Sequence, residues 1–178
     1  AFDYSINLDF DDKGEYENVL PENFSIDPNV TVEQKDGYIE MKGSSLNTGI
    51  TYTFPEKVKD DIVSFSFKVN KTEKTNFKVL VNGIGAIAIF KAGSGVGRFF
   101  AYVGSDKYAH FNKNPDTYFP CDNKWAKITL SYDLKNGRLR VFENDVETAY
   151  IKHGGDGKEE WNDGKYIDSG ITGIDKIA

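Results

Sequence analysis

The sequence predicts an all-β protein, and three observations favour this class. Several segments alternate apolar and polar residues with a period of two, most clearly residues 62–69, where the large apolar side chains share one face. Turn-forming residues punctuate these segments, including Asn-Gly dipeptides at 82–83 and 136–137. The chain is 14% aromatic and has no long Leu/Ala-rich helical segment. Its 178 residues fit one domain, 1–178, built as an antiparallel sandwich or barrel.

Short strands are expected along most of the chain, each bounded by turn residues. The segments expected to form strands are 7–12, 30–33, 38–41, 48–54, 62–69, 77–81, 84–90, 98–103, 127–132, 138–141, 148–151 and 166–178. The strand at 48–54 is expected to end at Pro55, because proline has no N–H to donate to a neighbouring strand. Residues 104–124 read as a long loop, or a short strand with loops around it, and 153–164 as a charged, Gly-rich loop.

Residues 125–151 carry the most regular pattern and organise the predicted fold. In 127–132 Lys, Thr and Ser alternate with apolar residues, which is typical of a half-buried strand. Asn136-Gly137 supplies two residues that tolerate positive φ, so a tight reversal is expected there. Asn144-Asp145 offers a second reversal, and 148–151 is expected to return as a third strand. The stretch therefore predicts a β-meander with one wet and one dry face.

The same stretch resembles a known family. Trp-x-x-Ile-x-Leu-x-Tyr-Asp at 125–133, an Asn-Gly pair, and Leu-x-Val-Phe-x-Asn at 139–144 resemble the late hairpin of laminin-G-like and concanavalin-A-like jelly rolls. That hairpin usually ends in Tyr-x-Asn-Gly, whereas this chain has Asp145 in place of the glycine. The resemblance implies a two-sheet antiparallel jelly-roll sandwich. It also implies that Trp125 packs against the end of the sandwich.

Charge, cysteine content and chain ends limit the function classes. The net charge is −6 with scattered acids, which argues against non-specific binding to nucleic acid or to an acidic membrane. Cys121 is alone, so no internal disulfide forms, and the two histidines make a catalytic thiol an unfavoured interpretation. No stretch approaches the ~20 apolar residues of a membrane span. Because the sequence stops as if inside a strand, we expect a module of a longer exported protein, secreted or cell-surface.

Two motifs suggest enzymes but have simpler interpretations. Glu143-x-Asp145-x-Glu147 resembles the signature of jelly-roll retaining glucan hydrolases, which need two carboxylates ~5–5.5 Å apart. Asn144 stands where that family has an aliphatic residue, and the segment falls on a predicted hairpin turn, so a solvated turn is favoured. The glycines at 83–85 lack the strand-to-helix context of a dinucleotide site. We therefore expect a chain that is not an enzyme.

A structural calcium site is implied by the resemblance. Many carbohydrate-binding jelly rolls hold Ca²⁺ between an acid on the first strand and an Asp near the start of the last. Asp9 and Asp11 near the start of the chain, and Asp175 near its end, resemble those positions. Hard oxygen ligands from distant segments would hold the termini together. The alternative is that these acids merely cap strand ends.

The aromatic residues point to a sugar-binding face. Phe99, Ala101 and Val103 share one parity and are expected in the core, whereas Phe100 and Tyr102 lie on the other face. Aromatic rings cover the apolar face of a pyranose, and an arginine supplies a fork of donors for hydroxyls or a uronate. The predicted ligand-binding residues are Lys78, Arg98, Phe100, Tyr102, Tyr108, Tyr118 and Trp161. His110 lies among them in the sequence.

These patterns favour a non-catalytic carbohydrate-binding module that targets a polysaccharide for an attached exported enzyme. Its partners would be a polysaccharide or oligosaccharide and the other modules of the same polypeptide, without nucleic acid or membrane. A laminin-G-like adhesion or protein-interaction module is the first alternative. The second is a glycoside hydrolase acting through Glu143 and Glu147, or a polysaccharide lyase acting through Arg98, Tyr108 and His110.

Overall fold

The protein is built from antiparallel strands. The computed structural model describes residues 22–45, 48–89, 99–103, 107–110, 121–147, 150–153, 159–162 and 167–178. Of these, 99–103, 107–110, 150–153 and 159–162 are described by their strand pairing. The described residues form strands and turns without a helix, so the predicted all-β class is confirmed. It follows that no described helix could span a membrane.

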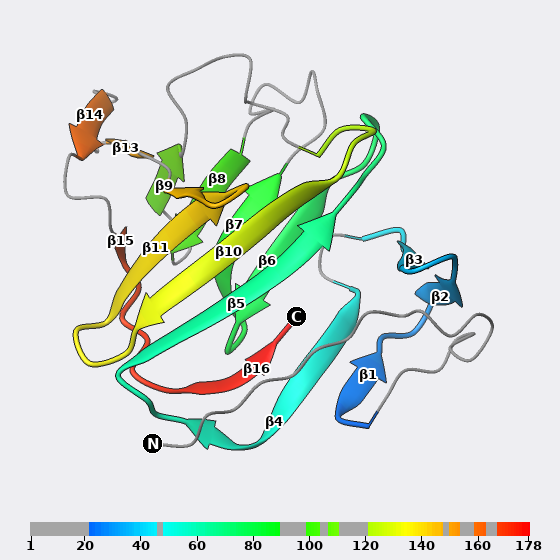
Figure 1. Cartoon of the computed structure of the whole chain (residues 1–178), viewed down its shortest axis with the longest axis horizontal. Helices are drawn as coiled ribbons and strands as arrows, with labels where there is room; N and C mark the ends of the chain where they lie inside the picture. Colours follow the sequence, from blue (N-terminus) through cyan, green and yellow to red (C-terminus); the bar gives the residue numbers. More distant parts are fainter. Residues whose placement is uncertain are drawn as a thin grey trace.

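Sixteen strands of the described residues form three sheets (Figure 1). In chain order they are β1 (Phe24–Ile26), β2 (Thr31–Gln34), β3 (Ile39–Lys42), β4 (Ile50–Val58), β5 (Ile62–Val69), β6 (Phe77–Val81), β7 (Ile84–Ile89), β8 (Phe99–Val103), β9 (Lys107–His110), β10 (Ala126–Asp133), β11 (Arg138–Glu143), β12 (Val146–Glu147), β13 (Tyr150–His153), β14 (Glu159–Asn162), β15 (Ile167–Asp168) and β16 (Ile174–Ile177). The nine-stranded sheet has the order β1-β4-β16-β6-β7-β8-β9-β13-β14. The five-stranded sheet has the order β12-β11-β10-β5, with β15 also paired to β11.

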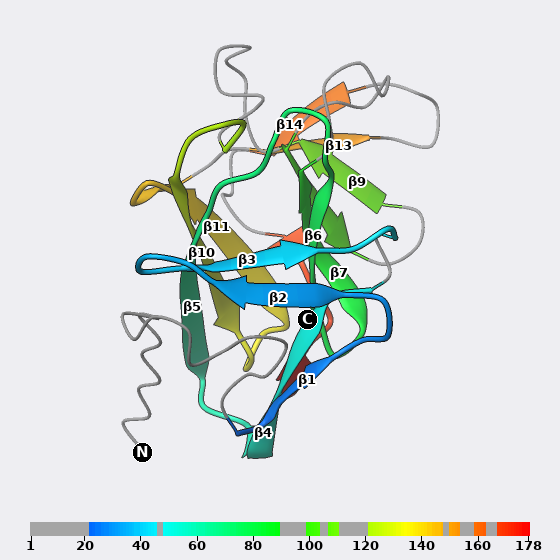
Figure 2. The same ribbon diagram turned by 90° about the vertical axis from the view of Figure 1, so that its right-hand side faces the viewer.

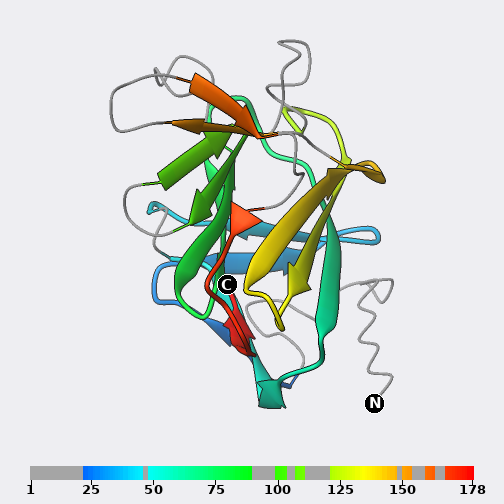
Figure 3. The same cartoon turned by 90° about the vertical axis from the view of Figure 1, so that its left-hand side faces the viewer.

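The two larger sheets face each other, and a hairpin crosses one open side between them. Figure 3 shows β5, β10 and β11 on one side and β6 and β7 on the other. The two-stranded sheet β2–β3 runs across this gap in Figure 2. Val32 on β2 is 1% exposed, so the inner face of the hairpin closes part of the core.

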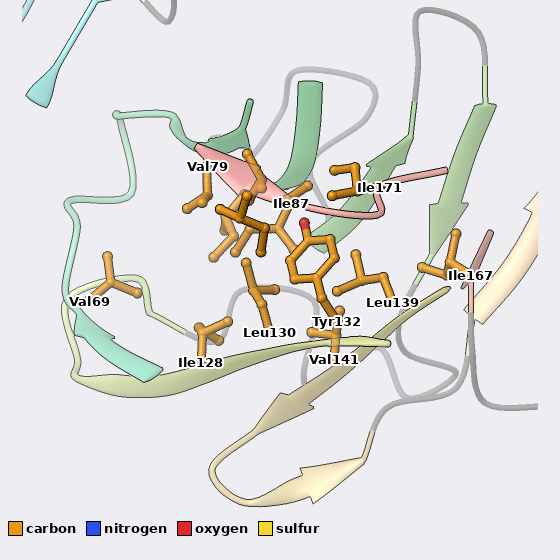
Figure 4. Packing of buried hydrophobic residues seen from close by; sticks show 14 of the residues in the cluster. Val69, Val79, Ile87, Ile128, Leu130, Tyr132, Leu139, Val141, Ile167 and Ile171 are labelled. Carbon is orange, nitrogen blue, oxygen red and sulfur yellow. The ribbon is translucent and has the colours of Figure 1, made fainter. Parts of the chain in front are cut away.

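The core lies between the sheets and follows the predicted alternation. On β10 every second residue is buried, including Ile128, Leu130 and Tyr132. Figure 4 shows Leu130 and Tyr132 pointing across the gap toward Ile87 on β7. The predicted strand 62–69 is confirmed as β5, whose alternate residues pack against this core. Burial of this apolar surface is the main stabilising term for the sandwich.

The predicted meander is right for its first two strands and wrong for its third. β10 and β11 pair over their full lengths, and β12 returns along β11 for two residues. The segment expected to continue as the third strand instead forms β13, which pairs with β9 and β14 in the other sheet. Alternation of side chains indicates a strand but does not indicate which sheet the strand joins.

The Asn136-Gly137 turn is also longer than predicted. Asp133 pairs directly with Arg138, so four residues connect β10 to β11, and of the Asn-Gly pair Gly137 alone has positive φ, at 64°. The Asp133 carboxylate accepts hydrogen bonds from the backbone N–H and the side-chain amide of Asn136, at 3.0 and 2.8 Å. This local capping by an Asp side chain holds the wider turn.

Strand β4 continues past Pro55, where it was expected to end. β1 pairs with β4 over Ile50–Tyr52, so Pro55 lies beyond the end of β1. On the other side, β16 shifts its register against β4 between Ile174 and Lys176. Proline is tolerated at a bulge or beside an open edge because no ladder bond requires its missing N–H.

Candidate functional site

The strand register brings most of the predicted ligand-binding positions onto one face of the nine-stranded sheet. Directly paired residues of an antiparallel ladder share a face of the sheet. One continuous row of such pairs crosses six strands and consists of Lys78, Ala88, Phe100, His110, Ile151 and Trp161. Three predicted positions, far apart in the sequence, therefore occupy one line across the sheet.

This row lies on the outer face of the sheet, away from the core. Val79 and Ile87 belong to the core, so their neighbours Lys78 and Ala88 occupy the opposite face. Position 101 pairs with Ile87 and position 99 with Ile89, which places both on the core face as predicted. Phe100 and Tyr102 consequently occupy outer positions.

Two further residues join the same face through β9. Tyr102 pairs with Tyr108, and Tyr108 lies two residues before His110 on the same strand. We name the positions Lys78, Phe100, Tyr102, Tyr108, His110 and Trp161 the outer aromatic face. Arg98 and Tyr118, the other predicted ligand-binding residues, lie outside the described residues.

Tyr108 and Trp161 lie in strands, whereas the sequence placed them in loops. Trp161 belongs to β14, which is the last strand of the nine-stranded sheet in the described part of the chain. Strands at a sheet edge commonly carry charged and polar residues. The sequence Glu-Glu-Trp-Asn of β14 therefore gives no alternation from which a strand can be recognised.

Near the centre of this face the backbone is well covered. Ala88 is 2% exposed although it occupies an outer position, and Lys78 beside it is half-buried. The Ala88 position in this row is therefore inaccessible to a ligand.

A second aromatic surface lies at the rim of the sandwich. Trp125 precedes β10 and is 49% exposed, and Tyr38 at the β2–β3 turn is 36% exposed. Their ring centroids lie 5.3 Å apart with an interplanar angle of 68°, an edge-to-face contact. We name these two residues the rim pair. The resemblance implies that Trp125 packs against the end of the sandwich, and in the structure it packs on Tyr38 and keeps about half of its surface exposed.

Two ion pairs lie on the hairpin that carries Tyr38. Lys35 pairs with Glu33 at 2.9 Å, and Lys42 pairs with Glu40 at 3.0 Å. The hydrogen bond from Lys35 lowers the pKa of Glu33, and the same contact raises the pKa of Lys35. These charges are matched within the hairpin, so the rings are the chemically distinctive part of this rim.

The acidic motif forms a turn, as its simpler interpretation predicted. Asn144 and Asp145 have φ values of 49° and 67°, which match a tight two-residue hairpin turn. Glu143 pairs with Val146, whereas Glu147 pairs with Phe142, so the two glutamates fall on opposite faces of the hairpin. This arrangement does not suit two carboxylates acting on one glycosidic bond.

Glu147 already has a strong partner on the outer face of the five-stranded sheet. Arg140 donates hydrogen bonds from Nε and Nη2 to its two carboxylate oxygens, both at 2.7 Å. This fork raises the pKa of Arg140. The Arg140 guanidinium also lies 5.8 Å from the centre of the Phe142 ring. The cluster is a closed network of mutual contacts.

The predicted calcium ligands are described in part. Asp175 is exposed, and its carboxylate lies 3.5 Å from the Lys57 ammonium. Its backbone N–H donates to Asn82 Oδ1 at 2.7 Å. Asp9 and Asp11 lie outside the described residues. Within the described ranges, no three His, Cys, Asp or Glu side chains gather as metal ligands.

Comparisons with known proteins assign no family to the chain. No protein-family model, curated protein or solved structure matches it. The resemblance to laminin-G-like and concanavalin-A-like jelly rolls thus depends on residues 125–144 and on the strand pattern.

Proposed function

We propose that the chain is a non-catalytic carbohydrate-binding module. The observation that carries this proposal is the strand register, which gathers Lys78, Phe100, Tyr102, Tyr108 and Trp161 on one outer face. A polysaccharide chain presents alternating apolar faces and hydroxyl edges. A row of aromatic residues with a cation at one end offers stacking and hydrogen bonding to such a ligand.

The fold that suits this function is a concanavalin-A-like jelly roll. Two facing antiparallel sheets and the β10–β11 hairpin support it, because the motif that resembles that family lies on this hairpin. The module would belong to a longer exported polypeptide and would direct an attached enzyme to its substrate. Calcium bound by Asp9, Asp11 and Asp175 would then be a structural ion that holds the chain ends.

The rim pair is the alternative position for the glycan. Trp125 and Tyr38 expose aromatic surface at the side of the sandwich where the hairpin crosses. A tryptophan held at its edge by a tyrosine keeps part of its ring available for stacking. If the glycan binds the outer aromatic face, substitutions there should reduce binding, and if it binds the rim pair, substitution of Trp125 should. One binding experiment with both sets of variants therefore distinguishes the two surfaces.

Affinity electrophoresis across a panel of plant and bacterial glycans, with and without a chelator, tests the function. We expect retardation by at least one glycan. A Phe100→Ala, Tyr102→Ala double variant should lose most of the retardation, because each stacked ring contributes on the order of 1 kcal/mol. Trp125→Ala tests the rim pair, and Thr129→Ala, on the outer face of the other sheet, is the matched control.

The remaining outcomes decide between the alternatives. A reducing-sugar assay on any bound glycan should detect no product, and product release would overturn the non-catalytic proposal. A lyase would then be favoured over a hydrolase, because Tyr108 and His110 share one face whereas Glu143 and Glu147 do not. Failure to bind any glycan would instead favour a laminin-G-like adhesion module.

A further inference from the structure

A buried lysine and a partly buried aspartate meet at one end of the sandwich. Lys71 follows the end of β5, and Asp122 precedes the start of β10, where the two segments run side by side in Figure 1. The Lys71 N–H donates to Cys121 O at 2.9 Å, and the Asn123 N–H donates to Lys71 O at 2.7 Å. The backbone thus fixes both residues on adjacent segments.

The side chains of this pair are largely withdrawn from water. They are 5% exposed for Lys71 and 13% for Asp122. Lys71 Nζ donates to Asp122 Oδ1 and, at 3.4 Å, to the carbonyl oxygen of Thr72. Withdrawing two charges from water carries a large desolvation cost that their attraction need not offset. Conversion of the pair to a neutral amide would remove both buried charges.

A second carboxylate lies on the core face at the same end of the sandwich. Glu143 pairs with Ile128, which is fully buried, so Glu143 occupies the core face of β11 and not its outer face. Burial raises the pKa of the Cys121 thiol to about 11, and the charges of Lys71, Asp122 and Glu143 also act on this thiol. An amine and two carboxyl groups therefore lie at the same end of the sandwich as this buried thiol.

We propose that Lys71 and Asp122 condense to an intramolecular isopeptide bond, with Glu143 carrying protons between them. The reaction starts from the neutral amine and carboxylic acid, which differ from the ion pair by one proton transfer. Lys71 Nζ attacks Asp122 Cγ, and a new N–C bond forms. Glu143 takes a proton from Nζ and delivers it to the departing hydroxyl, so the C–O bond breaks and water leaves. No oxidant, reductant or cofactor takes part.

The geometry supplies what this reaction requires. The backbone contacts hold nucleophile and electrophile together, which replaces a bimolecular encounter by an intramolecular one. The bond would tie the end of β5 to the segment before β10 and enclose β6 to β9 in a covalent loop. Such a cross-link restricts the unfolded chain as a disulfide does, in a chain whose only cysteine has no intramolecular partner. The inference is independent of glycan binding.

Intact-mass measurement of the purified full chain under denaturing conditions tests the proposal. We expect a mass lower than that of the sequence by one water molecule. Lys71→Arg and Asp122→Ala should each restore the full sequence mass. Peptide mapping of the native sequence should find one branched peptide that joins residues 71 and 122. Lys127→Arg is the matched control, because Lys127 forms an exposed ion pair with Asp145 at 2.8 Å, and it should retain the lowered mass.

The mass of the native-sequence protein tests whether the isopeptide bond forms, even if a variant fails to fold. The full sequence mass would overturn the proposal and leave Lys71 and Asp122 as an ion pair. Loss of water that persists in Lys71→Arg would overturn it too, because the bond would then lie elsewhere. Glu143→Gln should restore the full mass, and retention of the lowered mass would overturn the role of Glu143.

Discussion

The two Asn-Gly dipeptides of the chain form turns of different kinds, one in each large sheet. Asn82 and Gly83 connect β6 to β7, and both have positive φ, at 54° and 75°. Asn136 and Gly137 end a wider connection between β10 and β11, in which Gly137 has positive φ and Asn136 does not. The same dipeptide therefore specifies a reversal but not the type of turn.

The difference lies in what each asparagine contacts. The Asn82 amide donates to Gly173 O at 2.7 Å, and its Oδ1 accepts from the Asp175 N–H at 2.7 Å, so this turn holds the last strand of the chain. Asn136 contacts Asp133, three residues earlier. A long-range partner fixes the first turn and a local partner fixes the second.

Replacing the asparagines should separate the two turns most strongly. Asn82→Ala removes three side-chain hydrogen bonds to backbone groups and places alanine, which tolerates positive φ less well than asparagine, at this position. We expect a loss of about 2–3 kcal/mol in the free energy of unfolding. Asn136→Ala removes an exposed local contact and should cost about 0.5 kcal/mol. Urea denaturation of both variants measures the difference.

Asn82→Gly is the control for this first prediction. It keeps the positive φ accessible but removes the side-chain contacts, so its loss of stability isolates the hydrogen bonds to Gly173, Asp175 and Lys176. We expect about 2 kcal/mol. Equal stability of Asn82→Ala and Asn136→Ala would show that the long-range contacts do not distinguish the turns.

Alanine substitution of the glycine should have a similar effect on stability in the two turns. Gly83 and Gly137 both have positive φ, and neither site has an atom closer than 3.5 Å to an added Cβ. Alanine at either position should therefore cost about 1 kcal/mol through backbone strain alone. Thermal or urea unfolding of the two variants measures this. A much larger loss of stability for one of the two variants would show that the turns differ in their backbone conformation and not only in the contacts of the asparagine side chain.

The sequence could predict the local features of this fold but not its long-range register. Period-two alternation correctly identified β5, β6 and β10, because one face of each strand packs on the core. Alternation could not show that β13 joins the nine-stranded sheet, because pairing partners are set by the other strands. Nor could it show where Asn82 would find a partner, since Gly173 lies 91 residues away.

The same limit applies to the candidate site: the sequence indicates which face of its strand a residue occupies, but not which strands lie beside it. The parity of Phe100 and Tyr102 could be read from the sequence, but their alignment with Lys78 and Trp161 comes from pairings across several strands. The contact of Trp125 with Tyr38 could not be predicted from the sequence, because Tyr38 comes from a hairpin far away in the sequence.

The local turn should be visible in the titration of Asp133. The hydrogen bonds from the side chain and backbone of Asn136 hold the pKa of this carboxyl below its ordinary value of 3.8. Because the folded pKa is the lower one, the contact stabilises the fold above the ordinary pKa, and this contribution is lost as the pH falls through the folded pKa. NMR titration of the Asp133 carboxyl should show the depressed midpoint.

Asn136→Ala supplies the control for that titration. It removes the side-chain donor but keeps the backbone N–H, so the pKa of Asp133 should rise part of the way to its ordinary value. Asn82→Ala should leave it unchanged, because Asn82 belongs to the other sheet. An unchanged midpoint in Asn136→Ala would show that the local contact does not hold the turn in solution.

The smallest effect is expected from the ion pair beside the Asn82 turn. Lys57 and Asp175 lie 3.5 Å apart with both side chains about half exposed, and such pairs contribute under ~0.5 kcal/mol. Lys57→Met keeps the aliphatic stem that lies against Gly173 and removes the charge, so its free energy of unfolding should stay within that range. If Asp175 binds calcium with Asp9 and Asp11, added Ca²⁺ should raise the Tm of the native sequence and of Lys57→Met but not of Asp175→Asn. A Tm independent of Ca²⁺ in all three would leave Asp175 with the ion pair alone, and the last strand would be held at this end by Asn82.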